Sequence, residues 1–146
     1  MSKATKLFIV MSIVYLLIGS TVGVFFMMIP ELTMYLPAHV HLNLLGWVTF
    51  MIFGVLYHVL PRFLGKPLYK PGLAMVHFWM ANIGLIGMIV GWIGYRTAGS
   101  GTWLVILAAA GAVQLLSMYI FGYNILRTIY GKPQFEPIQF HHHHHH

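Results

Sequence analysis

Four long apolar runs, separated by short polar or proline-containing segments, dominate the chain. They cover residues of about 7–29, 39–60, 72–95 and 102–129. A helix of about 20 apolar residues spans the hydrocarbon core of a bilayer. Because a helix satisfies its backbone hydrogen bonds internally, such runs are stable in lipid. The pattern predicts an all-α integral membrane protein, a four-helix bundle that forms one transmembrane domain over residues 1–140.

The first apolar run has one alternative interpretation, a secretory signal peptide, because a short basic head at residues 1–6 precedes it. The apolar region of a signal peptide is only about 7–15 residues long and is followed by a small-x-small cleavage site. This run is longer, and no such site follows it. We therefore predict a membrane helix here.

Small residues recur within the apolar runs. They are Gly19 and Gly23 in the first run, Gly84, Gly87, Gly91 and Gly94 in the third, and the stretch 108–112 in the fourth. Small residues at such spacings let two membrane helices approach closely. We interpret these positions as helix-packing surfaces and not as catalytic positions.

Lysine and arginine are distributed unequally between the two ends of the predicted bundle. Only Arg96 lies at one end, and the seven at the other end are Lys3, Lys6, Arg62, Lys66, Lys70, Arg127 and Lys132. Cytoplasmic loops of membrane proteins carry an excess of these residues. The distribution predicts that both termini are cytoplasmic. His39 and His41 then lie near the outer face, and His58 and His77 lie near the cytoplasmic face.

The amino-acid composition indicates the class of protein and excludes several kinds of metal and cofactor site. The chain is 59% hydrophobic and 7% charged, which is typical of an integral membrane protein. The absence of cysteine excludes disulfides, thiolate metal sites, iron–sulfur clusters and thioether-linked haem. Glu31 and Glu136 are the only acidic residues, which excludes a carboxylate-rich metal cage. The net charge of +6 does not indicate a nucleic-acid partner, because the positive residues are distributed according to the predicted membrane side.

The native histidines are the candidate site residues. Residues 141–146 are six consecutive histidines, an expression tag, which leaves His39, His41, His58 and His77. A histidine at membrane depth is a functional-site hypothesis because it loses its hydration. At about 100° per residue, the side chains of His39 and His41 point to opposite sides of one helix. They cannot bind one metal ion together, and each needs its own partner.

The other two histidines are weaker candidates. His58 lies about 25 Å beyond His41 along a straight helix. His58 and His77 flank the basic turn 61–71, where they could be neighbours and where water and headgroups could satisfy them. We therefore do not predict them as cofactor ligands. Three aromatic residues of the same run could flank a porphyrin or pack against other helices, and these are Trp47, Phe50 and Phe53.

Several motifs resemble the last four transmembrane helices of haem–copper oxidase subunit I, the cytochrome c oxidase subunit I family. They are Ala-His-Val-His at 38–41, a Tyr-to-Gly stretch with Pro-Arg at 57–65, Val-His-Phe-Trp at 76–79 and Tyr-Asn-Ile-Leu-Arg at 123–127. In that family the two histidines of the first motif ligate two haems on opposite faces of one helix. The resemblance therefore implies that His41 is an axial ligand of a low-spin haem b, and that His39 is a candidate ligand of a second haem.

The resemblance also implies what this chain does not supply. The family's copper-binding histidines and active-site tyrosine lie on helices outside the region of resemblance, so we expect no complete haem–copper active site and no copper. The second histidine of the low-spin haem also comes from another part of the family's chain. We therefore expect a homo-oligomer, a dimer or a trimer, that holds haem between protomers. The second imidazole would come from another copy or from another protein.

Three functions remain open from the sequence. The first is a haem b protein of a prokaryotic inner membrane that carries electrons or binds a small gas such as O2 or NO, with oxidoreductase activity undecided. Its partners would be the bilayer, other copies of itself, and other respiratory-chain subunits or a redox donor. The second is a non-catalytic structural or assembly subunit of a larger respiratory oxidase. The third is a metal carrier that uses His39, His41 or the pair His58 and His77.

Overall fold

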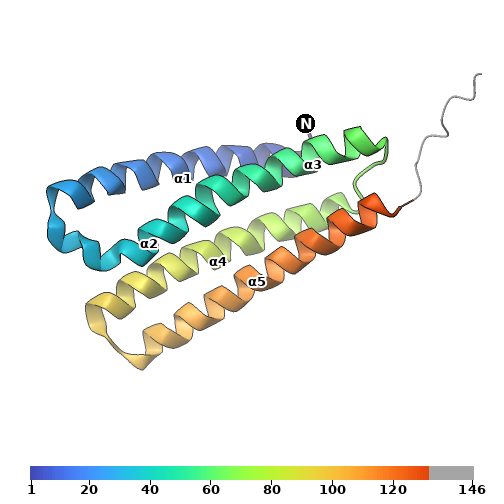
Figure 1. Ribbon diagram of the computed structural model, residues 1–146. Coiled ribbons are helices and arrows are strands. Elements are labelled where there is room, and N and C mark those ends of the chain that lie inside the picture. The colour runs from blue at the N-terminus through green and yellow to red at the C-terminus, as the bar shows by residue number, and fades with distance from the viewer. Residues whose placement is uncertain (132–146) are drawn as a thin grey trace, which may run out of the picture.

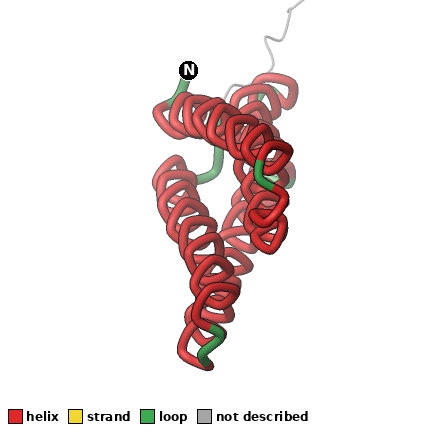
Figure 2. Tube along the Cα trace, turned by 90° about the vertical axis from the view of Figure 1, so that its left-hand side faces the viewer, coloured by secondary structure: helices red, strands yellow, loops and turns green. Residues whose placement is uncertain are grey.

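The computed structural model describes residues 1–131, and within that range the chain is helical apart from short connections (Figure 2). The helical elements, in chain order, are α1 (Lys3–Met28), the 3₁₀ segment η1 (Pro30–Tyr35), α2 (Leu36–His41), the π-helical segment η2 (Leu42–Thr49), α3 (Phe50–Leu64), α4 (Pro71–Ala98) and α5 (Gly101–Ile129). The predicted tag at 141–146 lies outside the described residues.

Four helical stretches are long and apolar enough to cross a membrane, namely 3–28, 30–64, 71–98 and 101–129. This confirms the predicted all-α, four-helix membrane fold. The helices begin and end within a few residues of the predicted bounds, except for the second stretch, which is longer at both ends. The cytoplasmic placement of both termini remains a prediction from the charge distribution.

The segment 30–37, predicted to be a connection, is helical in the structure. Pro30 and Pro37 lie at the first positions of η1 and α2, where a missing N–H costs no intrahelical hydrogen bond. At the other end, α3 continues through Pro61 and stops at Leu64. Gly65 ends it with a left-handed backbone, φ 63°, that glycine adopts without steric cost.

The helices form two hairpins, α1 with the long stretch 30–64 and α4 with α5 (Figure 1). α4 packs against α2 and η2 as well as α5, and the Tyr35 hydroxyl lies 2.8 Å from Thr97 Oγ1. α5 packs along α4 and reaches the long stretch through α3. A surface between η2 and α5 is therefore left uncovered within the described chain.

The glycines of α4 let α5 approach closely, as predicted. A Cβ atom added at Gly84 would lie 3.0 Å from the Cα of Gln114, and one added at Gly91 would lie 3.0 Å from the Cα of Leu107. The neighbouring atoms belong to the α5 backbone, which cannot move without separating the helices. The two helices thus pack at backbone distance, and interhelical van der Waals contact is the main force that holds membrane helices together.

Replacing Gly91 with leucine should push α4 and α5 apart and lower the free energy of unfolding by about 1–3 kcal/mol, the usual cost of overpacking. Loss of helicity during titration with a denaturing detergent measures this. Gly72→Leu is the matched control on the same helix, since a Cβ at Gly72 meets no atom within 4 Å. Equal stability of the two variants would contradict the predicted packing.

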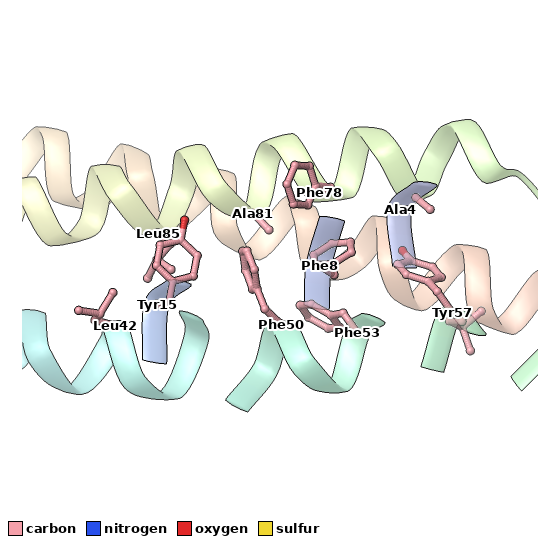
Figure 3. Close-up of a cluster of buried hydrophobic side chains, with 12 residues drawn as sticks. Ala4, Phe8, Tyr15, Leu42, Phe50, Phe53, Tyr57, Phe78, Ala81 and Leu85 are labelled. Carbon is pink, nitrogen blue, oxygen red and sulfur yellow. The ribbon is translucent and has the colours of Figure 1, made fainter. Parts of the chain in front are cut away.

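The core is an aromatic cluster near the end of the bundle that carries the loop 65–70. Phe8 of α1 is fully buried and packs edge-on against Phe50 and Phe53 of α3 and Phe78 of α4 (Figure 3). Phe50 and Phe53 are 0% and 5% exposed. These two rings therefore pack inside the chain, and of the two roles considered for them, helix packing is confirmed.

Candidate functional site

The helix that carries His41 holds its ring in one orientation and, for the neutral ring, in one tautomer. Its Nδ1 lies 2.7 Å from the carbonyl oxygen of Pro37, one turn earlier. A carbonyl oxygen can only accept, so Nδ1 carries the proton and donates it. Nε2 is then the ring nitrogen with a free lone pair. A neutral imidazole whose other nitrogen donates to a backbone carbonyl is the usual arrangement of a metal-ligating histidine.

The side chain of His41 lines an open groove of about 350 Å³ between η2, α4 and α5. We call it the His41 groove, and its walls include Leu44, Met88, Gly111, Gln114 and Met118. Small-molecule sites are typically apolar concavities of about 300–1,000 Å³ with a few placed polar groups. The groove has that volume and lining, with one imidazole and one amide as its polar side chains.

Gln114 also lines the groove, but its amide faces α4. The residue is 3% exposed, a Cβ added at Gly84 would lie 2.7 Å from its Oε1, and neither Oε1 nor Nε2 has a hydrogen-bond partner within residues 1–131. Leaving a buried polar group unpaired costs about 1–3 kcal/mol. Because both amide atoms are buried, they are not placed to contact a molecule bound in the open groove.

The backbone directly after His41 is also unusual. η2 is π-helical over eight residues, and the side-chain hydroxyl of Thr49 donates a hydrogen bond of 2.6 Å to the carbonyl of Leu44, five residues earlier. Gly46 in this segment faces Tyr15 of α1 so closely that an added Cβ would lie 2.8 Å from that ring. Single π-helical turns occur often at functional sites. Because a π-helical turn contains more residues than an α-helical turn, side chains beyond η2 point in other directions than about 3.6 residues per turn would give. The prediction for His58, which counted α-helical turns from His41, does not include this change.

His39 points to the other side of the helix, as predicted, and packs against α1. Its ring lies 5.2 Å from the ring of Phe26, and a Cβ added at Gly23 would be 3.3 Å from its Cε1. Asn43 Nδ2 lies 3.2 Å from Nε2 and can donate to it. Nδ1 is buried and has no partner among the described residues. Both ring nitrogens of His39 therefore face the protein.

The surroundings of His77 differ from those predicted from the sequence. It is fully buried in the aromatic cluster, with its ring 4.4 Å from that of Phe53 and 4.8 Å from that of Phe8. Its Nδ1 lies 2.8 Å from the hydroxyl of Tyr57, and its Nε2 has no partner within the described chain. The prediction that water and headgroups satisfy His77 is wrong, because α1 and α5 cover this part of α4.

His58, the predicted neighbour of His77, faces away from it. It is partly exposed and lines a pocket with Ser2, Arg62 and other residues at the end of the bundle. Tyr57, one residue earlier, takes the inward position and contacts His77 instead. Tyr57 was not among the candidate residues predicted from the sequence. The spacing of Phe50, Phe53 and Tyr57, which is typical of one helix face, was the signal that could have identified it.

The chain is similar to known respiratory proteins. A family model described as Cytochrome C and Quinol oxidase polypeptide I matches residues 1–131. Over 115 residues, 62% of this chain, it is 30% identical to the Cbb3-type cytochrome c oxidase subunit CcoN1 of Stutzerimonas stutzeri and covers 24% of that protein. Over 120 residues, 66% of this chain, it is 28% identical to cytochrome c oxidase subunit 1 of Rhodobacter capsulatus and covers 23% of it. The chain thus spans about a quarter of the length of these curated relatives.

Proposed function

Because the chain belongs to the cytochrome c and quinol oxidase polypeptide I family and is a haem–copper oxidase-like membrane protein, we propose that it holds haem b at His41. Electron transfer or binding of a small gas such as O2 or NO would be its role. One observation carries the proposal. The Nδ1 of His41 lies 2.7 Å from the Pro37 carbonyl, and its ring lines an open, mainly apolar groove.

The residues of the His41 groove fit such a group. The Pro37 carbonyl orients the imidazole so that Nε2 would be the ligating atom. Leu44, Met88 and Met118 keep water from the ligand, and an apolar surrounding of this kind tunes the potential of a bound iron. When bound, haem would supply the redox-active iron.

We propose that a second copy of the chain completes the site. The groove is open, and among the residues that line it His41 is the only histidine. His39 faces α1, His77 is enclosed by aromatic rings, and His58 lies at the other end of the long helix. A sixth ligand from this protein would therefore be the His41 of another protomer, in a dimer or a trimer.

The proposal is limited to His41. In the sequence His39 was also a candidate ligand, but its Nε2 lies 3.2 Å from Asn43 Nδ2 and its Nδ1 is buried against the protein. A ligating role for His39 would require Asn43 to release Nε2 or the protein to uncover Nδ1. We place the protein in the cytoplasmic membrane of a prokaryote, which its four apolar helices and its bacterial relatives support.

The test is a reduced-minus-oxidised spectrum of the detergent-purified protein, with haem counted by the pyridine haemochrome method and carbon monoxide added afterwards. About one haem per two chains with no carbon monoxide shift supports a shared site with two imidazoles and electron transfer. A carbon monoxide shift supports an open iron position and gas binding. Absence of haem in protein made with ample haem would overturn the proposal in favour of a structural or assembly subunit.

Gly111 allows the groove to be filled without disturbing the fold. A Cβ at Gly111 would meet no atom within 4 Å, although this residue lines the groove beside His41. Gly111→Leu should therefore lower haem affinity about tenfold or more, which corresponds to about 1.4 kcal/mol. Haem titration of the apoprotein measures it.

Gly101→Leu is the matched control, because Gly101 lies on the same helix and is equally open but does not line the His41 groove. It should bind haem as the unmodified protein does. Equal haem affinity of the Gly111 and Gly101 variants would show that the groove is not the haem site.

A further inference from the structure

A second cavity lies at the opposite end of the bundle from the His41 groove, where the loop 65–70 packs on the end of α5. Asn124 fixes this loop by accepting a hydrogen bond from the Lys70 backbone N–H at 3.1 Å and donating one to the Lys70 carbonyl at 2.9 Å. The hydroxyl of Thr128 accepts a further bond from the Tyr69 N–H at 2.9 Å. Three bonds to one short loop make the cavity beside it a preformed feature.

The cavity has a volume of about 480 Å³ and is basic. We call it the basic pocket, and its lining includes Lys66, Leu68, Tyr69, Arg127 and Tyr130. The Lys66 ammonium donates one hydrogen bond of 2.6 Å to the last turn of α5, which leaves two of its three donors. The Arg127 guanidinium lies 4.8 Å from the centre of the Tyr69 ring, a cation–π geometry.

No acidic side chain of the described residues balances this charge. Within residues 1–131 the one carboxylate side chain is Glu31, which lies in η1 at the other end of the bundle. Hydrogen bonding to Tyr123 and then to Arg127, with the charges of Arg127 and Lys70, lowers the pKa of the Tyr69 phenol. The positive charges of Arg127 and Lys70, which contribute to this shift, also favour a phosphate group.

An apolar groove adjoins the basic pocket and runs along α5. Its volume is about 430 Å³, and its lining is Leu115, Met118, Tyr119, Gly122, Tyr123 and Leu126. Tyr123 connects the two cavities, because its ring packs edge-on against that of Tyr69 at 5.9 Å. The groove therefore leads from the cationic side chains into the part of the helix that faces lipid.

We propose that the basic pocket and the adjoining groove bind one anionic phospholipid. Lys66 and Arg127 contact the phosphodiester, and one acyl chain lies along α5 over Gly122. Basic pockets at the membrane boundary recognise anionic headgroups in this way. A free phosphate would use the cations but not the groove, whereas a phospholipid uses both. The basic pocket lies at the other end of the bundle from His41 and does not depend on the proposed haem, whereas the adjoining groove shares Leu115 and Met118 with the lining of the His41 groove.

The test compares two arginines that differ only in their surroundings. Arg96 also stacks on an aromatic ring, with its guanidinium 5.8 Å from the Trp92 ring, but it lies at the other end of α4 and outside the basic pocket. Delipidated protein in a neutral detergent is titrated with phosphatidylglycerol or phosphatidylcholine, and native mass spectrometry counts the bound lipid. We expect phosphatidylglycerol to bind with the higher affinity. Arg127→Gln should lower that affinity about tenfold, and Arg96→Gln should leave it unchanged.

A second variant keeps the charges and changes only the groove. Gly122→Leu places a side chain where the added Cβ meets no atom within 4 Å, so the fold is retained, and it should also lower phosphatidylglycerol affinity. The proposal is overturned by equal affinity for the two lipids or by equal losses in the Arg96 and Arg127 variants. It is also overturned if inorganic phosphate binds the pocket as tightly as phosphatidylglycerol does, since that result indicates a small-anion site.

Discussion

Replacing His41 with alanine should remove the haem spectrum of the purified protein and weaken its oligomer. His41 is the only histidine that lines the groove, and the Pro37 carbonyl leaves its Nε2 free to ligate. Without that ligand, bound haem per chain should fall at least about tenfold, or about 1.4 kcal/mol in binding free energy. If haem bridges two protomers, dissociation into monomers should then occur at a correspondingly higher protein concentration.

The control for this prediction is His58→Ala. His58 lies at the other end of the long helix and is partly exposed, so its loss should leave the spectrum and the oligomer nearly unchanged. Pyridine haemochrome analysis and light scattering in detergent measure the two properties. A His41→Ala protein that keeps both its spectrum and its oligomer would show that the resemblance to the oxidase family does not extend to haem ligation by this residue.

Replacing Phe8 with alanine should cause the largest loss of stability. Its fully buried ring contacts residues of two other helices, including Phe50 and Phe53 of α3 and Phe78 of α4 (Figure 3). Truncating a buried phenylalanine leaves a cavity and typically costs about 3–5 kcal/mol. We expect about 3 kcal/mol here, because in lipid the transfer of apolar surface from water contributes less and lost packing contributes most.

Unfolding by a denaturing detergent, followed by circular dichroism, measures this loss. Phe63→Ala is the control, since Phe63 is 83% exposed near the end of α3 and removing its ring leaves no cavity in the core. A Phe8→Ala protein as stable as the Phe63→Ala protein would mean that the aromatic cluster does not hold α1 against the other helices.

Several properties of this chain followed from its sequence because their causes act locally. The four spans were predicted because unsatisfied backbone groups cannot be placed in lipid, whichever helices lie nearby. The glycines of α4 were correctly identified as packing positions, and Gly84 and Gly91 lie against the α5 backbone. The opposite directions of His39 and His41 followed from helical geometry alone.

Other properties depended on contacts between distant parts of the chain. The burial of His77 results from aromatic rings of α1, α3 and α5 that surround it, and its hydrogen-bond partner is Tyr57 of α3, whereas the sequence had suggested His58 as a possible neighbour. The helical conformation of 30–37 was missed because a proline can begin a helix as well as end one. The π turns of η2 and the unpaired amide of Gln114 have no signal in the order of residues.

The sequence by itself therefore determined the membrane-spanning helices and the family, because apolar length and short motifs depend only on neighbouring residues. The tertiary structure decided which of two neighbouring histidines faces an open groove. His41 and His39 are two residues apart and have the same side chain. His41 lines an open groove beside α5, whereas His39 packs against Phe26 of α1. Whether Nε2 meets a groove or a neighbouring side chain is a property of helix packing, and packing depends on all of the helices at once.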